Sequence, residues 1–560
     1  MLMQSRIYHI LFALLFAGVA VAQSPEFVST QGITADIHRA NVGKISFTDQ
    51  DIPLASLRES DFLHQYTLTN KSNLFMTVFM GTSLTNYMHR IAPDLPADSL
   101  TKNGGYQFTF FVDGRQIYQS NLHPGAPYAR IKNTETLIRK PLIDNQHEGA
   151  WWSQSAWGRF IYNGGDQALT DGPHVFRLDI RAYVNYARPV VGELIASGEL
   201  RLDVNRKPVI NVAAVRLTAP KPYAGLPVSG ELFDTDKIKV LKGNIDAGVF
   251  RNITSVVVLQ NGKILIEEYF NGATRDSLHD VRSVGKSFAS ALTGIALQDG
   301  YLKSVEQPLS AFYNLKQYAN YSQAKADTRL AELLTMSSAF DGDDSDDSSP
   351  GNEENMYPTP DWIKFALDLP VLPQKFGGKW HYFTTGVVLL GDVLNKSVPG
   401  QLEQYANRKL FGPLGITTHQ WSYTPQKAVS MAGGIRMKAL DFAKFGQLYK
   451  NNGRWNGRQV LPAAWVQQSF QHHKPLPDRP DEFYGYLFWN KTYQVQGKAY
   501  ETYYCTGNGG NKIFVFRDQP LVVVVTARAY NQYYAHPQVD RIMEAFVLPA
   551  VFLKSERVKE

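Results

Sequence analysis

The segment that decides the fold reads DVRSVGKSFAS at residues 280–290, and it places Ser283 three positions before Lys286. Residues three apart lie on the same face of a helix, so the lysine amine is predicted to reach the serine hydroxyl. A serine hydroxyl is a poor nucleophile until a neighbouring base takes its proton, and an uncharged, buried lysine can be that base. The pair therefore predicts nucleophilic catalysis at the start of a buried helix.

The residues that follow agree with a buried helix. Apolar side chains recur at helical spacing from Val284 to Leu297, the small residues Gly294 and Ala296 allow close packing, and Gly300 ends the pattern. Taken alone, Ser-x-x-Lys occurs often by chance in a chain of 560 residues, and a solvated helix face is the simpler interpretation. Further segments are needed to decide between the two.

Composition limits the class of protein. The chain is 44% hydrophobic and 19% charged, which is typical of globular proteins, and its length leaves room for two or three domains. A formal net charge of +6 is small for this length, and no run of Lys and Arg could follow a phosphate backbone. Nucleic acid is therefore not an expected partner.

Residues 1–22 have the pattern of a secretory signal peptide. Arg6 precedes an apolar run that ends in Ala20-Val21-Ala22, which predicts cleavage after Ala22 and a secreted or periplasmic protein. The alternative, a membrane anchor, needs about 20 apolar residues, and this run is shorter. No transmembrane segment is expected after cleavage. The single cysteine, Cys505, cannot form an internal disulfide, so the domains must be held by their cores.

The mature chain is predicted to contain two domains. Residues 23–219 carry alternating, β-branched and aromatic runs separated by turn signals, which predicts an all-β, antiparallel sandwich. Three tryptophans there are expected in its core or at the domain contact, with a sugar-stacking platform as the alternative: Trp151, Trp152 and Trp157. Residues 220–234 are rich in Pro and Gly and predict a linker. Residues 235–560 predict an antiparallel sheet built from strands at both ends of the domain, with helices on its faces.

Four motifs together resemble the penicillin-recognising serine hydrolases over roughly residues 235–550. The motifs are Ser283 to Lys286, Leu333-Leu334-Thr335-Met336-Ser337-Ser338, Trp380 to Gly386, and Ala432-Gly433-Gly434-Ile435-Arg436. Within that family the chain looks closest to the class C β-lactamase-like branch, which includes esterases and 6-aminohexanoate-dimer hydrolases. The resemblance implies an α/β (α+β) domain like that of serine β-lactamases and penicillin-binding proteins.

The family's second motif is Tyr-x-Asn or Tyr-x-Ser, and Tyr382-Phe383-Thr384 matches it here. The resemblance implies that Tyr382 relays a proton between Ser283 and the leaving group. Thr384 stands in place of the usual amide or serine and is expected to contact the substrate or the Lys286 region, although a hydroxyl offers fewer hydrogen bonds than an amide.

The family's third motif is Lys- or His-Thr-Gly, and Cys505-Thr506-Gly507-Asn508 is the best match. The cation is missing, so the resemblance implies an oxyanion hole made by the backbone N–H groups of Asn508 and Ser283. Substrates that carry a carboxylate are expected to bind poorly because Cys505 cannot pair with them, unless Arg436 reaches the cleft and supplies the charge.

Two other groups of residues have more than one interpretation. The acidic run around Asp341 to Asp347 lacks the order of ligands of a calcium loop and is interpreted as a solvated loop near the cleft, able to repel anions or attract an amine. His279 and His381 adjoin motifs without metal-ligand spacing. No metal or cofactor is expected.

The sequence as a whole favours a secreted serine hydrolase that forms an acyl-enzyme on Ser283 with a small ester or amide. The alternatives are a cell-wall D-amino-peptide hydrolase, a β-lactamase, and a non-catalytic binding or sensor protein on the same fold. The acyl group, the leaving group and the oligomeric state depend on pocket shape, which the sequence does not describe.

Overall fold

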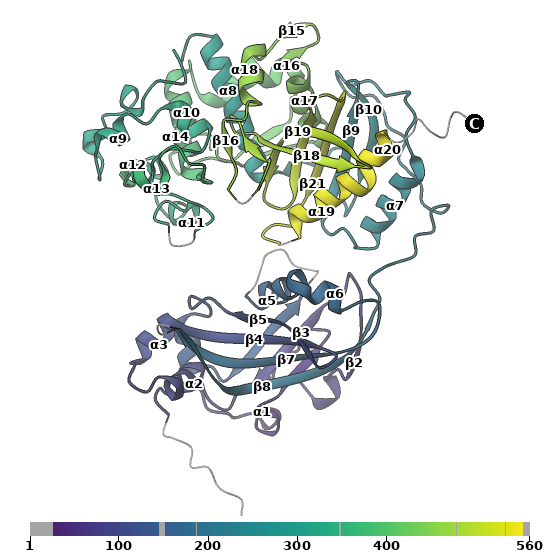
Figure 1. The fold of residues 1–560 in the computed structure, drawn as a ribbon, viewed down its shortest axis with the longest axis vertical. Helices are drawn as coiled ribbons and strands as arrows, with labels where there is room; N and C mark the ends of the chain where they lie inside the picture. The colour runs from purple at the N-terminus through teal and green to yellow at the C-terminus, as the bar shows by residue number, and fades with distance from the viewer. Residues whose placement is uncertain are drawn as a thin grey trace, which may run out of the picture.

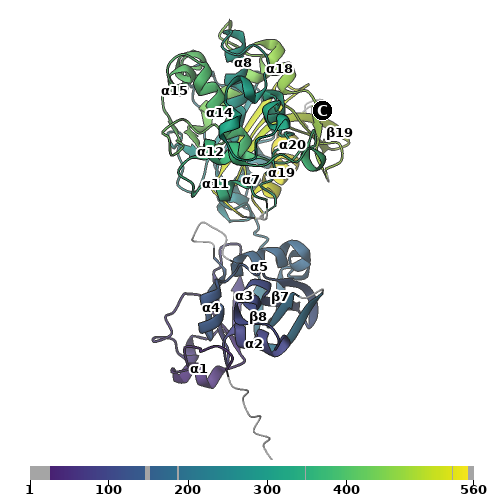
Figure 2. The same cartoon turned by 90° about the vertical axis from the view of Figure 1, so that its left-hand side faces the viewer.

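The structure, a computed structural model, describes residues 26–144, 152–185, 188–346, 349–477, 479–532 and 534–552. The signal peptide predicted over residues 1–22, Trp151 and Asp347 lie outside these ranges. The described residues form two bodies of ribbon in both views (Figures 1 and 2). Each has its own cluster of buried apolar side chains, one drawn from residues 45–204 and the other from residues 226–551.

The N-terminal unit contains the two sheets of the predicted sandwich. One sheet has five strands, in the spatial order β2 (Gln65–Leu68), β8 (Pro189–Val204), β7 (Gly172–Asn185), β4 (Gly104–Val112) and β5 (Arg115–Asn121). The other has three, in the order β1 (Ile45–Thr48), β3 (Leu74–Phe79) and β6 (Leu137–Ile143). All pairs are antiparallel except β2 with β8. Phe47 of the small sheet packs edge-on against Phe176 of the large one, so the two sheets share a core.

The N-terminal unit also contains short helices that the strand pattern did not predict. They are α1 (Asp36–Asn41), α2 (Leu84–Ile91), α3 (Ala97–Asn103), α4 (Ala129–Thr134), α5 (Trp152–Phe160) and α6 (Asp166–Ala168). Trp152 and Trp157 lie on α5, where Trp157 is buried in the core and Trp152 packs partly buried against it. Both tryptophans therefore have the packing role that we expected to be the main one.

The segment predicted as a linker is bonded to the second unit. The hydroxyl of Tyr223 donates to Asp441 Oδ1 at 3.1 Å, and the Lys444 amine lies 4.4 Å from the centre of the tyrosine ring. The N–H of Ser229 donates to the carbonyl of Ile264 at 2.8 Å. Helix α7 (Thr235–Asp246) follows, capped by the side chain of Asp234. Residues 220–234 are therefore part of the packed surface of the second unit rather than a loose tether.

The second unit is organised around one eight-stranded antiparallel sheet. Its strands are, in spatial order, β10 (Lys263–Tyr269), β9 (Ile253–Gln260), β21 (Leu521–Ala527), β20 (Asn511–Phe516), β19 (Lys498–Gly507), β18 (Trp489–Val495), β17 (Phe483–Tyr484) and β16 (Lys474–Pro475). Strands from the two ends of the domain meet where β9 pairs with β21. This confirms the predicted sheet, whose central strands are buried on both faces and therefore read as continuous apolar runs.

Helices cover both faces of this sheet (Figure 1). On one face lie α8 (Gly285–Gln298) and α17 (Ala439–Lys450), where Phe288 stacks on Phe445 with 3.9 Å between ring centres. On the other face lie α7, α19 (Ala535–Ile542) and α20 (Leu548–Phe552). Because side chains alternate along a strand, neighbouring residues of β19 and β20 point toward different helix layers.

The remaining helices and strands of the second unit lie between β10 and the last strands. The longer helices are α10 (Leu330–Leu334), α12 (Trp362–Asp368), α14 (Thr384–Ser397), α15 (Leu402–Ala406) and α18 (Ala463–Ser469). The short ones are α9 (Gln323–Ala326), α11 (Glu353–Met356), α13 (Pro373–Phe376) and α16 (Gly412–Leu414). A small sheet joins β11 (His279–Asp280), β13 (Ile435–Met437) and β12 (His419–Trp421), and β14 (Arg454–Trp455) pairs with β15 (Arg458–Gln459). Within the described ranges, no helix has the length and apolar character needed to cross a membrane.

Candidate active site

A cleft of about 1050 Å³ lies where the start of α8, the end of β19 and the segments around residues 343–345 and 380–382 meet. Ser283 and Tyr382 line it, together with Thr506, Gly507 and Asn508 of the third motif. Ser283 and Asn508, 225 positions apart in the sequence, are therefore brought to one cavity. Three predicted site residues, Lys286, Thr384 and Cys505, are buried and do not line it.

Ser283 lies in a short 3₁₀ turn, Arg282–Val284, immediately before α8. Arg282 has a φ of 51°, in the left-handed region that non-glycine residues rarely adopt, and such strain is found mainly where the surrounding structure imposes it. Lys286 lies one helical turn on and is only 2% exposed. Its Nζ is 2.7 Å from Ser283 Oγ, within hydrogen-bond distance. The geometry predicted from the spacing of the two residues is present.

Tyr382 is held beside this pair by Asp344. The N–H of Asp344 donates to the carbonyl of Tyr382 at 2.8 Å, and Asp344 Oδ2 accepts from the N–H of Thr384, also at 2.8 Å. The second carboxylate oxygen accepts from the N–H of Glu353 at 2.9 Å. The Lys286 amine lies 5.2 Å from the centre of the Tyr382 ring. Asp344 therefore bonds the backbone on both sides of Phe383 and orients the tyrosine toward the lysine.

The charge state of Asp344 depends on opposing effects. Burial raises the pKa of its carboxyl, while hydrogen bonds from Thr384 and the nearby Lys286 lower it. An aspartate of the acidic run thus has a bonding role that the sequence did not predict. In the structure the Asp344 carboxylate accepts from the first N–H groups of α11 and α14. Nothing in the local sequence distinguishes Asp344 from the neighbouring acids in this role.

The third motif divides between the two faces of β19. Cys505 is 1% exposed and points toward α8, and burial raises the pKa of its thiol to about 12, so the thiol stays neutral. Thr506 points to the other face and into the cleft. A Cβ on Gly507 would lie 2.9 Å from the backbone nitrogen of Ser283. The strand backbone therefore approaches the serine turn as closely as a glycine allows, which positions the N–H groups proposed for the oxyanion hole.

The cations of the cleft are not those considered from the sequence. Arg436 is exposed, lies 3.5 Å from Asp280, and does not line the cleft. Lys491, Lys512 and Arg479 do line it. The only local signal for Lys512 is a lysine within the apolar strand β20, and that signal does not reveal which cavity the side chain enters.

Three acidic side chains line the other side of the cleft: Asp343, Asp344 and Glu353. The acidic run is thus near the cleft, as predicted, but it is not the solvated loop that we expected, because Asp341 is buried and Asp343 and Asp344 are partly buried. His381 also lines it, buried, with Nδ1 3.1 Å from the carbonyl oxygen of Lys379, and burial lowers its pKa. His279 is buried away from the cleft lining, with Nδ1 between the hydroxyls of Thr254 and Thr526.

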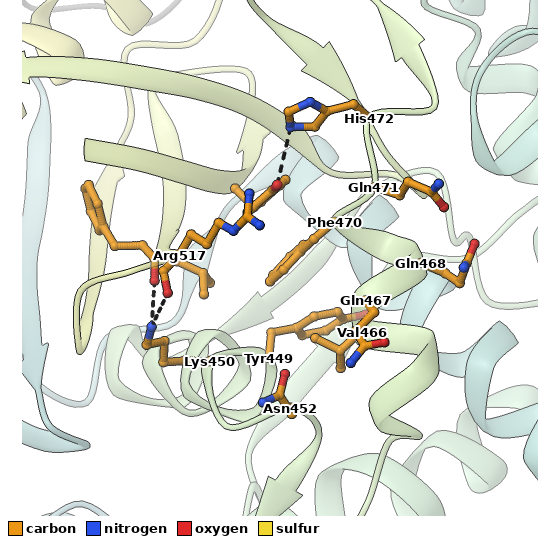
Figure 3. Close-up of a pocket in the computed structure, with 13 residues that line it drawn as sticks. Tyr449, Lys450, Asn452, Val466, Gln467, Gln468, Phe470, Gln471, His472 and Arg517 are labelled. Atoms are coloured by element: carbon orange, nitrogen blue, oxygen red, sulfur yellow. Dashed lines mark hydrogen bonds between the residues drawn. The ribbon is translucent and has the colours of Figure 1, made fainter. Parts of the chain in front are cut away.

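A second cavity, of about 590 Å³, lies on the far side of the sheet edge between α17, α18 and β20 (Figure 3). Its wall includes Phe470, Tyr503 and Lys450, and the Lys450 amine donates to the carbonyls of Phe516 and Arg517 at 2.8 and 2.7 Å. Among the described residues that line it, no amine contacts a side-chain hydroxyl as Lys286 contacts Ser283. The larger cleft is therefore the candidate site.

Comparison with known proteins finds one family match and several solved structures of low sequence identity. The family model Beta-lactamase matches residues 242–537. Among solved structures, a protein assigned as a 6-aminohexanoate-dimer hydrolase from Bacillus anthracis is 18% identical, with a TM-score of 0.47 over 60% of this chain and 91% of that one. An octameric penicillin-binding protein homologue from Pyrococcus abyssi is 18% identical, with a TM-score of 0.43 over 54% and 75% of the two chains.

A third solved structure is a D-stereospecific amidohydrolase from Streptomyces sp., 16% identical, with a TM-score of 0.41 over 52% of this chain and 93% of that one. No curated protein matches the chain. The family match spans more than half of the sequence and contains Ser283, Lys286, Tyr382 and the third motif. The protein therefore belongs to the beta-lactamase family of hydrolases.

Proposed function

We propose that the protein is a serine hydrolase that cleaves a small ester or amide through an acyl-enzyme on Ser283. The observation that carries this proposal is the 2.7 Å contact between Ser283 Oγ, which lines the cleft, and the buried Lys286 Nζ behind it. A general base must lie within hydrogen-bond reach of the proton that it takes, and this contact meets that condition.

The reaction follows from the placement of these groups. Ser283 Oγ attacks the substrate carbonyl carbon while its proton passes to Lys286 Nζ, directly or through the Tyr382 hydroxyl. The carbonyl oxygen becomes negative and accepts hydrogen bonds from the N–H groups of Ser283 and Asn508. The proton then moves to the leaving oxygen or nitrogen as its bond to carbon breaks. Water, deprotonated by the same groups, attacks the acyl-enzyme and releases the acid.

The test is covalent labelling of the full chain. Intact-mass measurement after treatment with a fluorophosphonate should show one adduct on the wild-type protein and none on Ser283→Ala. Lys286→Arg keeps a cation but cannot act as a base, so it should lose turnover of p-nitrophenyl acetate and remain folded by circular dichroism. Labelling that persists in Ser283→Ala would refute the assignment of the nucleophile.

Intact Ser283, Lys286 and Tyr382 favour catalysis over the alternative of a binding or sensor protein. Screening against neutral esters, D-peptides and a chromogenic cephalosporin separates the esterase or amidase from the cell-wall peptidase and the β-lactamase. The pattern of residues 1–22 further supports export, which N-terminal sequencing of the mature protein tests.

A further inference from the structure

A cluster of charged side chains forms the sheet side of the cleft. Thr506 on β19 pairs across the sheet with Lys512 on β20, so the two side chains share the face that looks into the cavity. Lys491, on β18 at the other side of β19, points to the same face. Both lysines contact one residue of α19, because Lys512 Nζ is 2.7 Å from Asp540 Oδ1 and Lys491 Nζ is 3.3 Å from Asp540 Oδ2.

This cluster has more donors than acceptors. Each ammonium carries three N–H donors, and within the described part of the chain Asp540 is the one carboxylate in ion-pair contact with either lysine. Asp540 Oδ1 also accepts from the hydroxyl of Tyr493 at 2.6 Å. Lys512 is only 4% exposed and the Lys491 side chain 15%, so water has little room to satisfy the remaining N–H groups. Buried cations in this situation favour an additional anionic partner.

The charges along the whole wall lead to the same conclusion. Arg479 pairs with Glu482 at 3.6 Å, and the lysines share Asp540, so the described wall has three cations against two carboxylates. Burial of Asp540 would raise its pKa, but the two lysine charges outweigh burial and lower the pKa to about 2. His536, also on this wall, is neutral at physiological pH because burial lowers its pKa to about 4. The cations of this wall thus outnumber its carboxylates by one, while burial lowers the pKa of Lys512.

The opposite side of the cleft carries Asp343, Asp344 and Glu353. An anionic group of a substrate is therefore repelled from the acidic side and attracted to the sheet side. The backbone of Gly507 approaches the Ser283 nitrogen, and the preceding residue, Thr506, pairs across the sheet with Lys512. The lysine cluster is therefore next to the proposed reacting centre.

We propose that Lys491 and Lys512 form an anion subsite, and that the preferred substrates carry a carboxylate a few bonds from the scissile ester or amide. This inference rests on the proposed function for the identity of the scissile bond. It reverses the expectation drawn from Cys505, because the charge absent at that position is supplied from the two neighbouring strands.

The test compares matched esters on the full chain. One series carries the carboxylate in the acyl group, as mono-p-nitrophenyl succinate, glutarate and adipate, against neutral p-nitrophenyl butyrate, valerate and hexanoate. A second carries it in the leaving group, as 4-acetoxybenzoate against its methyl ester. The wild-type protein should prefer the carboxylate in one series, as a ratio of kcat/KM. Lys491→Met should lower that ratio about 10- to 100-fold, since charge-assisted hydrogen bonds have this strength.

Two controls make the result specific. Lys491→Arg keeps the charge and should retain most of the preference, and Lys450→Met removes a lysine from the second cavity and should leave the ratio unchanged. Lys491 is the residue of choice because it is the less buried of the two, and loss of Lys512 would leave Asp540 with a weaker partner.

The outcomes separate this inference from the proposed function. Ser283-dependent turnover of neutral esters with no carboxylate preference in either series, or with a preference that Lys491→Met does not change, overturns the subsite and leaves the hydrolase intact. Turnover that is equal in Ser283→Ala overturns the proposed function. In that case calorimetric titration of glutarate into Ser283→Ala decides the subsite: binding weakened at least tenfold by Lys491→Met supports it, and binding unaffected or undetectable overturns it.

Discussion

Replacing Gly507 by alanine tests how closely the third motif must approach the nucleophile. A Cβ at this position would lie 2.0 Å from the carbonyl oxygen of Val281, 2.9 Å from the nitrogen of Ser283 and 3.0 Å from the nitrogen of Val284. All three atoms belong to the backbone, so no side chain can rotate away. Gly507 does not have a positive φ, and the alanine is therefore not strained by its own backbone conformation.

The size of the effect follows from these distances. Real Cβ atoms do not approach other heavy atoms closer than 3.0 Å, so the strand and the serine turn must separate by about 1 Å from the 2.0 Å contact. A misplacement of about 1 Å costs about 10²-fold in rate, and loss of one oxyanion donor costs about 10²–10³-fold. We expect kcat to fall by about 10²–10³-fold and the free energy of unfolding to fall by about 1–3 kcal/mol, as in overpacked cores.

The assay is hydrolysis of p-nitrophenyl acetate, with thermal unfolding followed by circular dichroism. Gly230→Ala is the matched control, because Gly230 also lacks a positive φ and has no atom within 4 Å of the added Cβ. That variant should keep the wild-type rate and stability. A folded Gly507→Ala protein with kcat within threefold of wild type would refute the reasoning, since the site would then tolerate separation of the strand from the turn.

Three further predictions follow from other contacts. Asp344→Asn keeps one acceptor oxygen but cannot accept from both the Glu353 and the Thr384 N–H groups. We expect kcat to fall about 10–100-fold and the free energy of unfolding in urea to fall by only about 1 kcal/mol. An unchanged kcat would contradict the orienting role. Burial lowers the pKa of His279 to about 4, against 6.5 in the unfolded chain, so the unfolded state binds the proton first and stability is lost as pH falls from 6.5 to 4. His279→Gln should therefore reduce the difference in unfolding free energy between pH 7 and pH 4 by about 3 kcal/mol. An equal difference in both proteins would exclude this assignment. A chain that begins at residue 229 lacks the Tyr223 bond to Asp441 and should melt about 5 °C below one that begins at residue 217; equal melting temperatures would show that the segment adds no stability.

Local patterns predicted much of the fold and the centre of the site. The spacing of Ser283 and Lys286 depends only on helical geometry, and the structure has their contact at 2.7 Å. The strands β9, β10, β20 and β21 contain short apolar runs bounded by turn residues, and they were predicted for that reason. The short helices α1 to α6 of the N-terminal unit were missed, because each spans nine residues or fewer and segments of that length are hard to distinguish from loops by periodicity.

Other features of the site depend on contacts between residues far apart in the sequence. Strand pairing and the helix that covers each face decide whether Arg436 or Lys512 faces the cleft. Contacts between distant segments likewise decide which acid of the run from Asp341 bonds the backbone beside Tyr382. Strand alternation buries Cys505 against α8 and turns Thr506 into the cleft, so the missing cation at one position says nothing about the neighbouring strands. The sequence by itself determined the contact of Ser283 with Lys286 and the individual strands, since these are set by periodicity within single segments. The tertiary structure alone decided the charge of the cleft, because charge at a site is the sum over side chains that only folding brings together.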